Sequence, residues 1–138
     1  MTDRMNRTEL MYACVDQNVN LVKNLLKEGA NVNLQDKSGW TALHFASQEC
    51  NYEIIKLLLE HSAVVDIEDS YGNTPLWRAL FNVRDDDERG KAVKLLLRHG
   101  ADKYKKNKSG ISPYDLAQDS SNYDLMQYLD DHKKYKSC

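Results

Sequence analysis

Histidine and cysteine are the side chains in this sequence that could do chemistry, and their spacing indicates which chemistry to expect. Cys14, His44 and Cys50 are all potential zinc ligands. Zinc sites, however, usually draw their ligands from close pairs such as C-x-x-C or H-x-x-x-H, and the sequence contains no such pair. A nucleophilic cysteine needs a base beside it, and the sequence places none next to Cys14 or Cys50. Structural roles are therefore favoured over a zinc site or covalent catalysis.

Carboxylates and glycines offer two further possibilities. The acidic run at residues 85–88 reads DDDE and could bind a divalent cation weakly, but it lacks the alternate-residue ligands of a calcium loop. A solvated loop is the favoured interpretation of this run. The 6 glycines are scattered singly, so no phosphate-binding loop is present. We expect no catalytic residue, no metal and no cofactor; an enzyme or metal protein with an unrecognised site stays the weaker alternative.

Internal repetition shows which elements must position these residues. Ala13, Ala46 and Ala79 are spaced 33 residues apart, and Ala117 follows after 38. Rows of leucine and glycine show the same two intervals. The chain therefore repeats one unit of 33 residues, with five extra residues after Ala79.

The unit at residues 36–68 shows what each repeat predicts. Residues 36–39 form a turn signal that ends in Gly39, and Thr41 can cap the helix that follows. A second helix is expected over residues 52–61. Ser62 stands where a glycine ends this helix in other repeats, so this helix end is expected to be strained or arranged differently. Helices this short cannot bury their apolar sides alone, so the units must stack on one another.

These motifs resemble the ankyrin repeat. The family pattern Thr-Pro-Leu-His-x-Ala appears as TALHFA at residues 41–46 and TPLWRA at residues 74–79, and LLLRHGAD at residues 95–102 matches the end of the pattern. The resemblance implies an all-α fold, an α-solenoid of four ankyrin-like repeats in which β-turn tips join helix-turn-helix units. It also implies that His44 forms structural hydrogen bonds with the turn. We expect one domain at 1–132, with repeats at about 8–35, 36–68, 69–106 and 107–132, and a basic tail at 133–138.

The resemblance further implies that a partner protein binds the concave face, which is formed by the turn tips and the exposed sides of the first helices. Trp40, Tyr71, Trp77 and Phe81 fall on or beside this face, and aromatic residues dominate interface energetics. Packing of Trp40 or Trp77 against a neighbouring turn is the alternative. By position, the expected partner-binding residues are Val15, Asp16, Gln35, Lys37, Ser38, Trp40, Gln48, Glu49, Glu68, Ser70, Tyr71, Asn73, Trp77, Phe81, Asn82, Lys106, Lys108 and Ile111.

The expected function is a non-enzymatic protein-protein interaction module. Because no second domain accompanies the repeats, binding is expected to be the whole activity, by inhibiting or regulating the partner, including neutralisation of a toxin by an immunity protein. The alternative is an adaptor that links two proteins, with the acidic insertion at 84–88 as a second contact site.

Charge and composition set the expected partners and compartment. The net charge of −2 does not indicate nucleic-acid binding, and no apolar run is long enough to span a membrane. The lysines of residues 103–108 could steer a partner with a complementary patch. Three scattered cysteines suggest no disulfide framework, so a cytoplasmic location is expected. We expect no nucleic acid or membrane partner, and a monomer when the chain is free.

Overall fold

The computed structural model of the protein describes residues 4–81, 87–119 and 129. Several predictions made above fall outside this part of the chain. They concern Asn82, most of the acidic insertion, the second half of the fourth repeat and the basic tail. The expected domain and repeat boundaries stay predictions.

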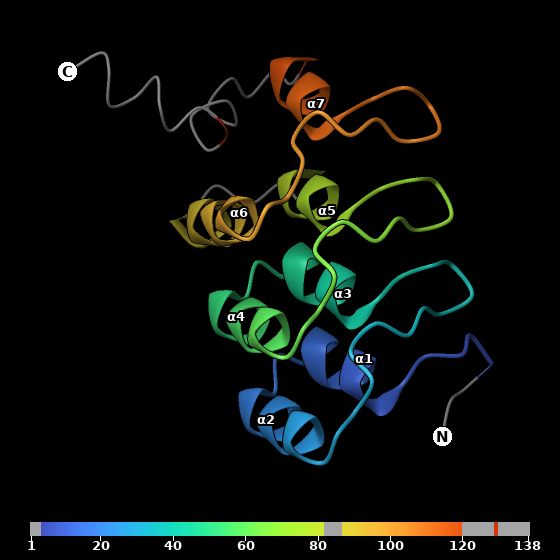
Figure 1. Cartoon of the computed structure of the whole chain (residues 1–138), viewed down its shortest axis with the longest axis vertical. Helices are drawn as coiled ribbons and strands as arrows, with labels where there is room; N and C mark the ends of the chain where they lie inside the picture. The colour runs from blue at the N-terminus through green and yellow to red at the C-terminus, as the bar shows by residue number, and fades with distance from the viewer. Residues whose placement is uncertain (1–3, 82–86, 120–128, 130–138) are drawn as a thin grey trace.

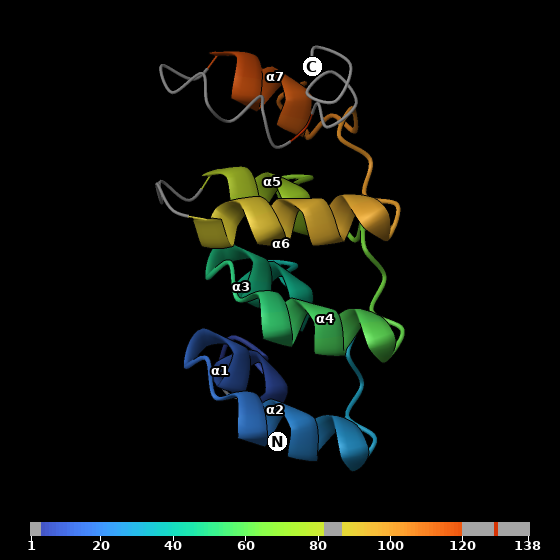
Figure 2. The same ribbon diagram turned by 90° about the vertical axis from the view of Figure 1, so that its left-hand side faces the viewer.

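Within the described residues the chain forms seven helices and no strand, which confirms the all-α solenoid. Figure 1 shows two columns of helices: α1, α3, α5 and α7 lie next to the turn tips, and α2, α4 and α6 form the outer column. In Figure 2, the loops that join α1 to α2 and α3 to α4 lie at the end opposite the connections to the next tip. The helices are α1 (Glu9–Val15), α2 (Val19–Lys27), α3 (Ala42–Gln48), α4 (Tyr52–Glu60), α5 (Pro75–Phe81), α6 (Asp87–Arg98) and α7 (Pro113–Asp119).

Local sequence explains where these helices begin. The Thr41 hydroxyl accepts a hydrogen bond from the backbone N–H of His44 and so caps α3. Asn18 and Asn51 cap α2 and α4, because each side-chain oxygen accepts a backbone N–H of the first turn at 3.1 Å. The repeated caps therefore place the helix starts at equivalent positions in successive units.

The helix end at Ser62 confirms the expected strain. Ser62 has φ 70°, in the same left-handed region as Gly29 (φ 89°) and Gly100 (φ 91°), which end α2 and α6. A residue with a Cβ costs roughly 1–2 kcal/mol in this conformation. The repeat geometry thus overrides the preference of the serine.

The core runs through the stack as rows of small and large residues. The alanine row is at most 1% exposed, and its small side chains allow neighbouring helices to approach closely. Leu58 and Leu96 are fully buried between the helices of successive repeats. Burying a leucine contributes roughly 1.5–3 kcal/mol, so these rows hold the units together.

The turn tips stack directly through their backbones. The N–H of Ser70 donates to the carbonyl of Ser38 at 2.9 Å, and the N–H of Lys108 donates to the carbonyl of Tyr71 at 2.9 Å. Gly72 lies at this contact, with φ +79°. The tips of successive repeats therefore form one continuous edge, which we call the tip edge (residues 35–40, 68–73 and 105–111).

One side chain gives each tip its conformation. Oδ1 of Asp36 accepts the backbone N–H groups of Ser38 at 2.8 Å and Trp40 at 2.9 Å. Asp69 and Asn107 make the same pair of hydrogen bonds in the next two tips. This Asx turn repeats at the 33- and 38-residue intervals, so the three tips share one backbone shape.

The loops after α2 and α4 share a hydrogen-bond pattern, which is complete at Asn33 and incomplete at Asp66. Asn33 accepts the N–H of Val64 at 2.9 Å and donates through Nδ2 to the carbonyl of Ser62 at 3.2 Å. Asp66 takes the equivalent position one repeat later and accepts the N–H of Asp102 at 3.0 Å. Its other oxygen, Oδ1, is buried without a hydrogen-bond partner. Burial raises the pKa of Asp66, and this effect exceeds that of the hydrogen bond from the Asp102 N–H, which lowers it.

Replacing Asp66 by asparagine is therefore expected to stabilise the protein by about 1 kcal/mol at neutral pH, because an amide can donate where the carboxylate cannot. Since the pKa of Asp66 is raised on folding, its ionised form opposes folding at neutral pH. This penalty disappears as the pH falls below the unfolded value of 3.8, so the gain should shrink there. Urea unfolding at several pH values measures it. Asp16→Asn, at an exposed site, is the control; a stability loss in Asp66→Asn would contradict the prediction.

Candidate binding surface

His44 holds its repeat together and is not available as a ligand. Its Nδ1 accepts the backbone N–H of Thr41 at 3.1 Å, so the ring proton lies on Nε2, which donates to the carbonyl of Asn73 at 2.9 Å. The ring is fully buried, and this burial lowers the pKa of His44. A neutral imidazole therefore links α3 to the next turn tip, which confirms the structural role expected from the resemblance.

The residue at the His44 position differs in the other repeats. Sδ of Met11 accepts the N–H of Thr8 at 3.3 Å, and Oδ2 of Asp115 accepts the N–H of Ser112 at 3.0 Å. Trp77 cannot close this cap, because an indole nitrogen donates but does not accept. The third repeat therefore lacks a hydrogen bond that the other three make.

Trp77 lies inside the protein and is not on the exposed surface that its sequence position suggested. It is 9% exposed, its ring stacks on Phe81 with centroids 4.9 Å apart, and its Nε1 has no hydrogen-bond partner. Trp77 is thus buried against Phe81 of its own helix, and neither exposure to a partner nor packing on a neighbouring turn describes this contact.

Trp40 and Asn73 also take part in contacts between repeats. The Trp40 ring packs on the Phe45 ring, with 4.8 Å between the centroids. The guanidinium of Arg78 lies 4.4 Å from the centroid of the Trp40 ring. Asn73 is buried, and its Oδ1 accepts a hydrogen bond from Asn107 at 2.8 Å. We therefore leave Trp40, Asn73 and Trp77 out of the binding surface proposed below.

Four of the expected apolar residues are exposed on the predicted face, and one more joins them. Tyr71 is 68% exposed at a turn tip, Phe81 is 54% exposed at the end of α5, and Val15 and Ile111 are 39% and 38% exposed. Sequence reasoning missed Tyr12, which is 41% exposed. Its i, i+3 spacing from Val15 on α1 was the signal that could have found it.

The polar residues expected on this face are divided between exposed and half-buried positions. Gln35 is tied to the tips, because its amide donates to the carbonyls of Gly39 at 2.9 Å and Glu68 at 3.0 Å. Ser38, Gln48 and Glu49 are half-buried. The exposed residues are Asp16, Gln35, Lys37, Glu68, Ser70, Lys106 and Lys108.

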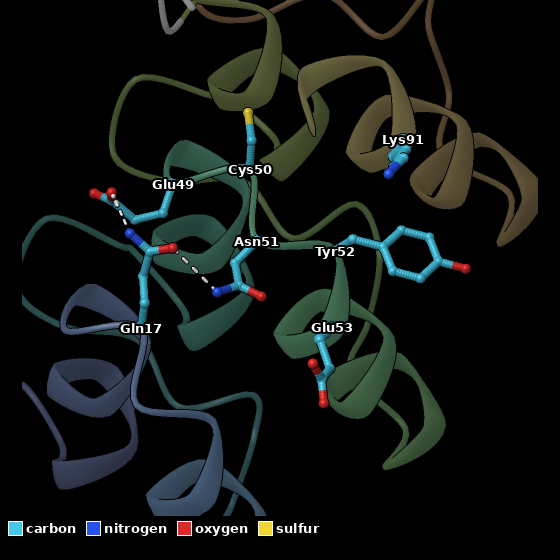
Figure 3. A pocket seen from close by; sticks show the side chains of 7 residues that line it. All are labelled: Gln17, Glu49, Cys50, Asn51, Tyr52, Glu53 and Lys91. Atoms are coloured by element: carbon cyan, nitrogen blue, oxygen red, sulfur yellow. Dashed lines mark hydrogen bonds between the residues drawn. The ribbon is translucent and has the colours of Figure 1, made fainter. Parts of the chain in front are cut away.

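A polar cavity of about 300 Å³ lies at the loops that join α1 to α2 and α3 to α4 (Figure 3). Gln17, Glu49 and Asn51 line one side of it, where Asn51 donates to Gln17 at 3.1 Å and Gln17 donates to Glu49 at 3.5 Å. Tyr52 and Glu53 of α4 and Lys91 of α6 line the rest, with Cys50. These hydrogen bonds pair amides and a carboxylate with one another, and none of them activates a nucleophile.

Both cysteines in the described part of the chain are free and buried. Burial raises the pKa of Cys14 to about 12, so this group is a neutral thiol and a poor nucleophile. The Cys50 sulfur lies 3.9 Å from the carbonyl oxygen of Ala79. Among the described residues, no three histidine, cysteine or acidic side chains are placed to share a metal ion.

None of the described helices is both long enough and apolar enough to cross a membrane. The partly exposed apolar residues of α1 and α5 instead lie on helices of seven residues each.

Comparison with known proteins agrees with this geometry. Residues 10–107 match a family model described as ankyrin repeats in three copies. Over 109 residues the chain is 36% identical to the human 2-5A-dependent ribonuclease. This match covers 78% of the chain but 10% of the ribonuclease, so the chain spans about a tenth of that protein's length.

Proposed function

Because the chain belongs to the ankyrin repeat family, whose members generally bind other proteins, we propose that it is a non-enzymatic module that binds a partner protein through its concave face. This face consists of the tip edge and the exposed sides of α1, α3 and α5. The residues proposed to contact the partner are those of the predicted set that are exposed or half-buried, apart from Trp40, together with Tyr12.

The distribution of exposed apolar side chains carries this proposal. Among the described residues, α1 and α5 expose Tyr12, Val15 and Phe81, and the tip edge exposes Tyr71 and Ile111. No large apolar residue of α2, α4 or the described part of α6 is exposed. The outer column of helices therefore presents a polar surface, whereas the inner column and the tips keep the residue types that partners bury.

We further propose that binding inhibits or regulates the partner. The hydrogen-bonded tip edge is a preorganised surface, so little ordering entropy opposes binding, and a rigid face of this kind can block a site on its target. Ribonuclease activity is not part of the proposal, since the match covers only a tenth of that relative. The two free, buried cysteines support a reducing, cytoplasmic compartment.

An adaptor is the second candidate, and the cavity in Figure 3 is the observation that favours it. This cavity lies at the interhelix loops of α1–α2 and α3–α4 and contains none of the exposed apolar residues of the concave face. A second protein bound there would share Glu49 with the concave face but would leave the exposed apolar residues of that face free for the first.

A double variant tests the concave face. Tyr71→Ala with Phe81→Ala should weaken binding to the natural partner by at least about a hundredfold, since exposed aromatic anchors each contribute ~2 kcal/mol. Affinity capture from native cells identifies the partner, and calorimetry measures the affinity. Val64→Ala with Tyr104→Ala removes equally exposed apolar groups outside this face and should bind normally.

The outcomes separate the candidate functions. A folded Tyr71→Ala, Phe81→Ala variant with unchanged affinity would overturn the concave-face proposal. One stoichiometric partner whose activity falls on binding supports inhibition. Two partners bound at once support the adaptor.

A further inference from the structure

We propose that the tip edge binds an acidic segment of the partner protein, with an apolar side chain of that segment packed on Tyr71. This inference rests on the proposed function and specifies the chemistry of the partner. It follows from how the charges of the tip edge are paired.

Ion pairs neutralise the carboxylates of the tip edge. The Asp36 and Asp69 side chains are at most 1% exposed, and each pairs with an arginine. Glu68 is more exposed but pairs with a lysine of the next tip. The pairs are Arg7–Asp36 at 3.5 Å, Arg78–Asp69 at 3.1 Å and Lys105–Glu68 at 3.1 Å.

Lysines without such partners remain on the same edge. Lys37 and Lys108 are exposed, and neither forms an ion pair with any described residue. Lys106 is exposed as well, and its charge acts on the Asp115 carboxylate. The tip edge is thus positively charged, although the chain as a whole carries a net charge of −2. A partner cannot compensate these lysines with its own lysines or arginines, so it should present carboxylates.

The backbone contacts between tips place an aromatic ring between these charges. Lys37 lies on the first tip, Tyr71 on the second and Lys108 on the third, and hydrogen bonds at 2.9 Å join the tips in this order. At 68% exposure, Tyr71 is the most exposed large apolar residue of the described chain. A segment that runs along the edge therefore meets basic, aromatic and basic groups in turn. The complementary segment is acidic, apolar and acidic.

A protein segment fits this surface better than single-stranded nucleic acid does. Nucleic acid binding without base readout uses several exposed aromatic rings on which successive bases stack. Here Arg78 covers the Trp40 ring and Trp77 is buried, which leaves Tyr71 as the one exposed aromatic ring among the described residues of the tip edge. Stacking of successive bases along the edge is therefore not supported.

Selection of peptides against the immobilised chain tests the inference. From a library of random dodecapeptides, we expect the selected peptides to be enriched in Asp and Glu around a Leu, Phe, Tyr or Trp. A selected peptide, made synthetically, should bind the Lys37→Glu, Lys108→Glu variant at least about tenfold more weakly than the wild type at low salt. Lys27→Glu with Lys56→Glu reverses two exposed lysines of α2 and α4 and should leave the affinity within about twofold. Added salt should also weaken the wild-type complex.

Four results would overturn the inference, and the last of them would overturn the proposed function too. The first is selected peptides that lack acidic enrichment. The second is a selected peptide that binds the Lys37→Glu, Lys108→Glu variant as tightly as the wild type but does not bind the Tyr71→Ala, Phe81→Ala variant. This result would support the concave face as the binding site and reject the acidic partner. The third is oligouridylate that binds more tightly than any peptide and depends on Lys37 and Lys108, which would reassign the edge to nucleic acid. Selected peptides that ignore both double variants would reject the concave face as well.

Discussion

Replacing Gly72 by alanine is expected to lower the free energy of unfolding by about 3 kcal/mol or more. A Cβ at this position would lie 2.8 Å from the backbone nitrogen of Lys108, closer than real contacts allow. The atom it meets is backbone, so no side chain can rotate away. The third tip must move, and the hydrogen bond from Lys108 to Tyr71 is then lost. Urea unfolding followed by circular dichroism measures the change.

Gly110 provides the matched control for this prediction. It has φ +78°, against +79° for Gly72, but a Cβ built there meets nothing within 4 Å. Gly110→Ala should therefore cost only the left-handed conformation of alanine, roughly 1–2 kcal/mol. The difference between the two variants isolates the contact between tips. Equal losses would mean that stacking of the tips contributes nothing to stability.

Replacing His44 by alanine is expected to lower the free energy of unfolding by about 3 kcal/mol, an effect close in size to that of Gly72→Ala. The change removes the cap on the Thr41 N–H and the bond to the Asn73 carbonyl, each worth about 1 kcal/mol, and leaves a cavity where the ring was. Thermal and urea unfolding measure the loss. His61→Ala, at an exposed helix end, is the control and should cost well under half as much.

The same residue predicts a pH dependence. Burial lowers the pKa of His44 below the unfolded value of 6.5, so the unfolded state binds a proton more readily. Stability from the neutral ring is complete above pH 6.5 and declines as the pH falls below it. The difference between wild type and His44→Ala should therefore narrow on acidification. A difference that stays constant from pH 7.5 down to about pH 5 would contradict the lowered pKa of the buried ring.

The periodic features of this protein were predictable from its sequence because each depends on short-range geometry. A threonine hydroxyl caps a helix whose first turn is adjacent in sequence, as Thr41 does. A left-handed helix end was expected to strain Ser62, and its φ of 70° confirms this. The role of His44 was also expected, because the resemblance to a family pattern includes the neighbours that it contacts.

The exposure of individual aromatic residues was not predictable in the same way. Trp40 and Tyr71 both lie at turn tips, yet Arg78 covers one ring and the other is 68% exposed. The two residues hold different positions in the repeat, since Trp40 corresponds to Asn73 and Tyr71 to Ser38. The group that covers Trp40 comes from the next repeat, so only the tertiary structure shows the contact. Trp77 was wrongly placed on the surface, because its ring is buried and stacks on Phe81 of the same helix.

By itself, the sequence determined the helical repeat, the register of the tips and the family, since these follow from spacings that recur at 33 and 38 residues. Only the tertiary structure decided which side chains are left for a partner. Exposure and charge pairing depend on contacts between residues far apart in sequence, such as Arg7 with Asp36 and Lys105 with Glu68, which are 29 and 37 residues apart. Those contacts neutralise the negative charges of the tip edge. Lys37, Tyr71 and Lys108 stay exposed and can therefore contact a partner.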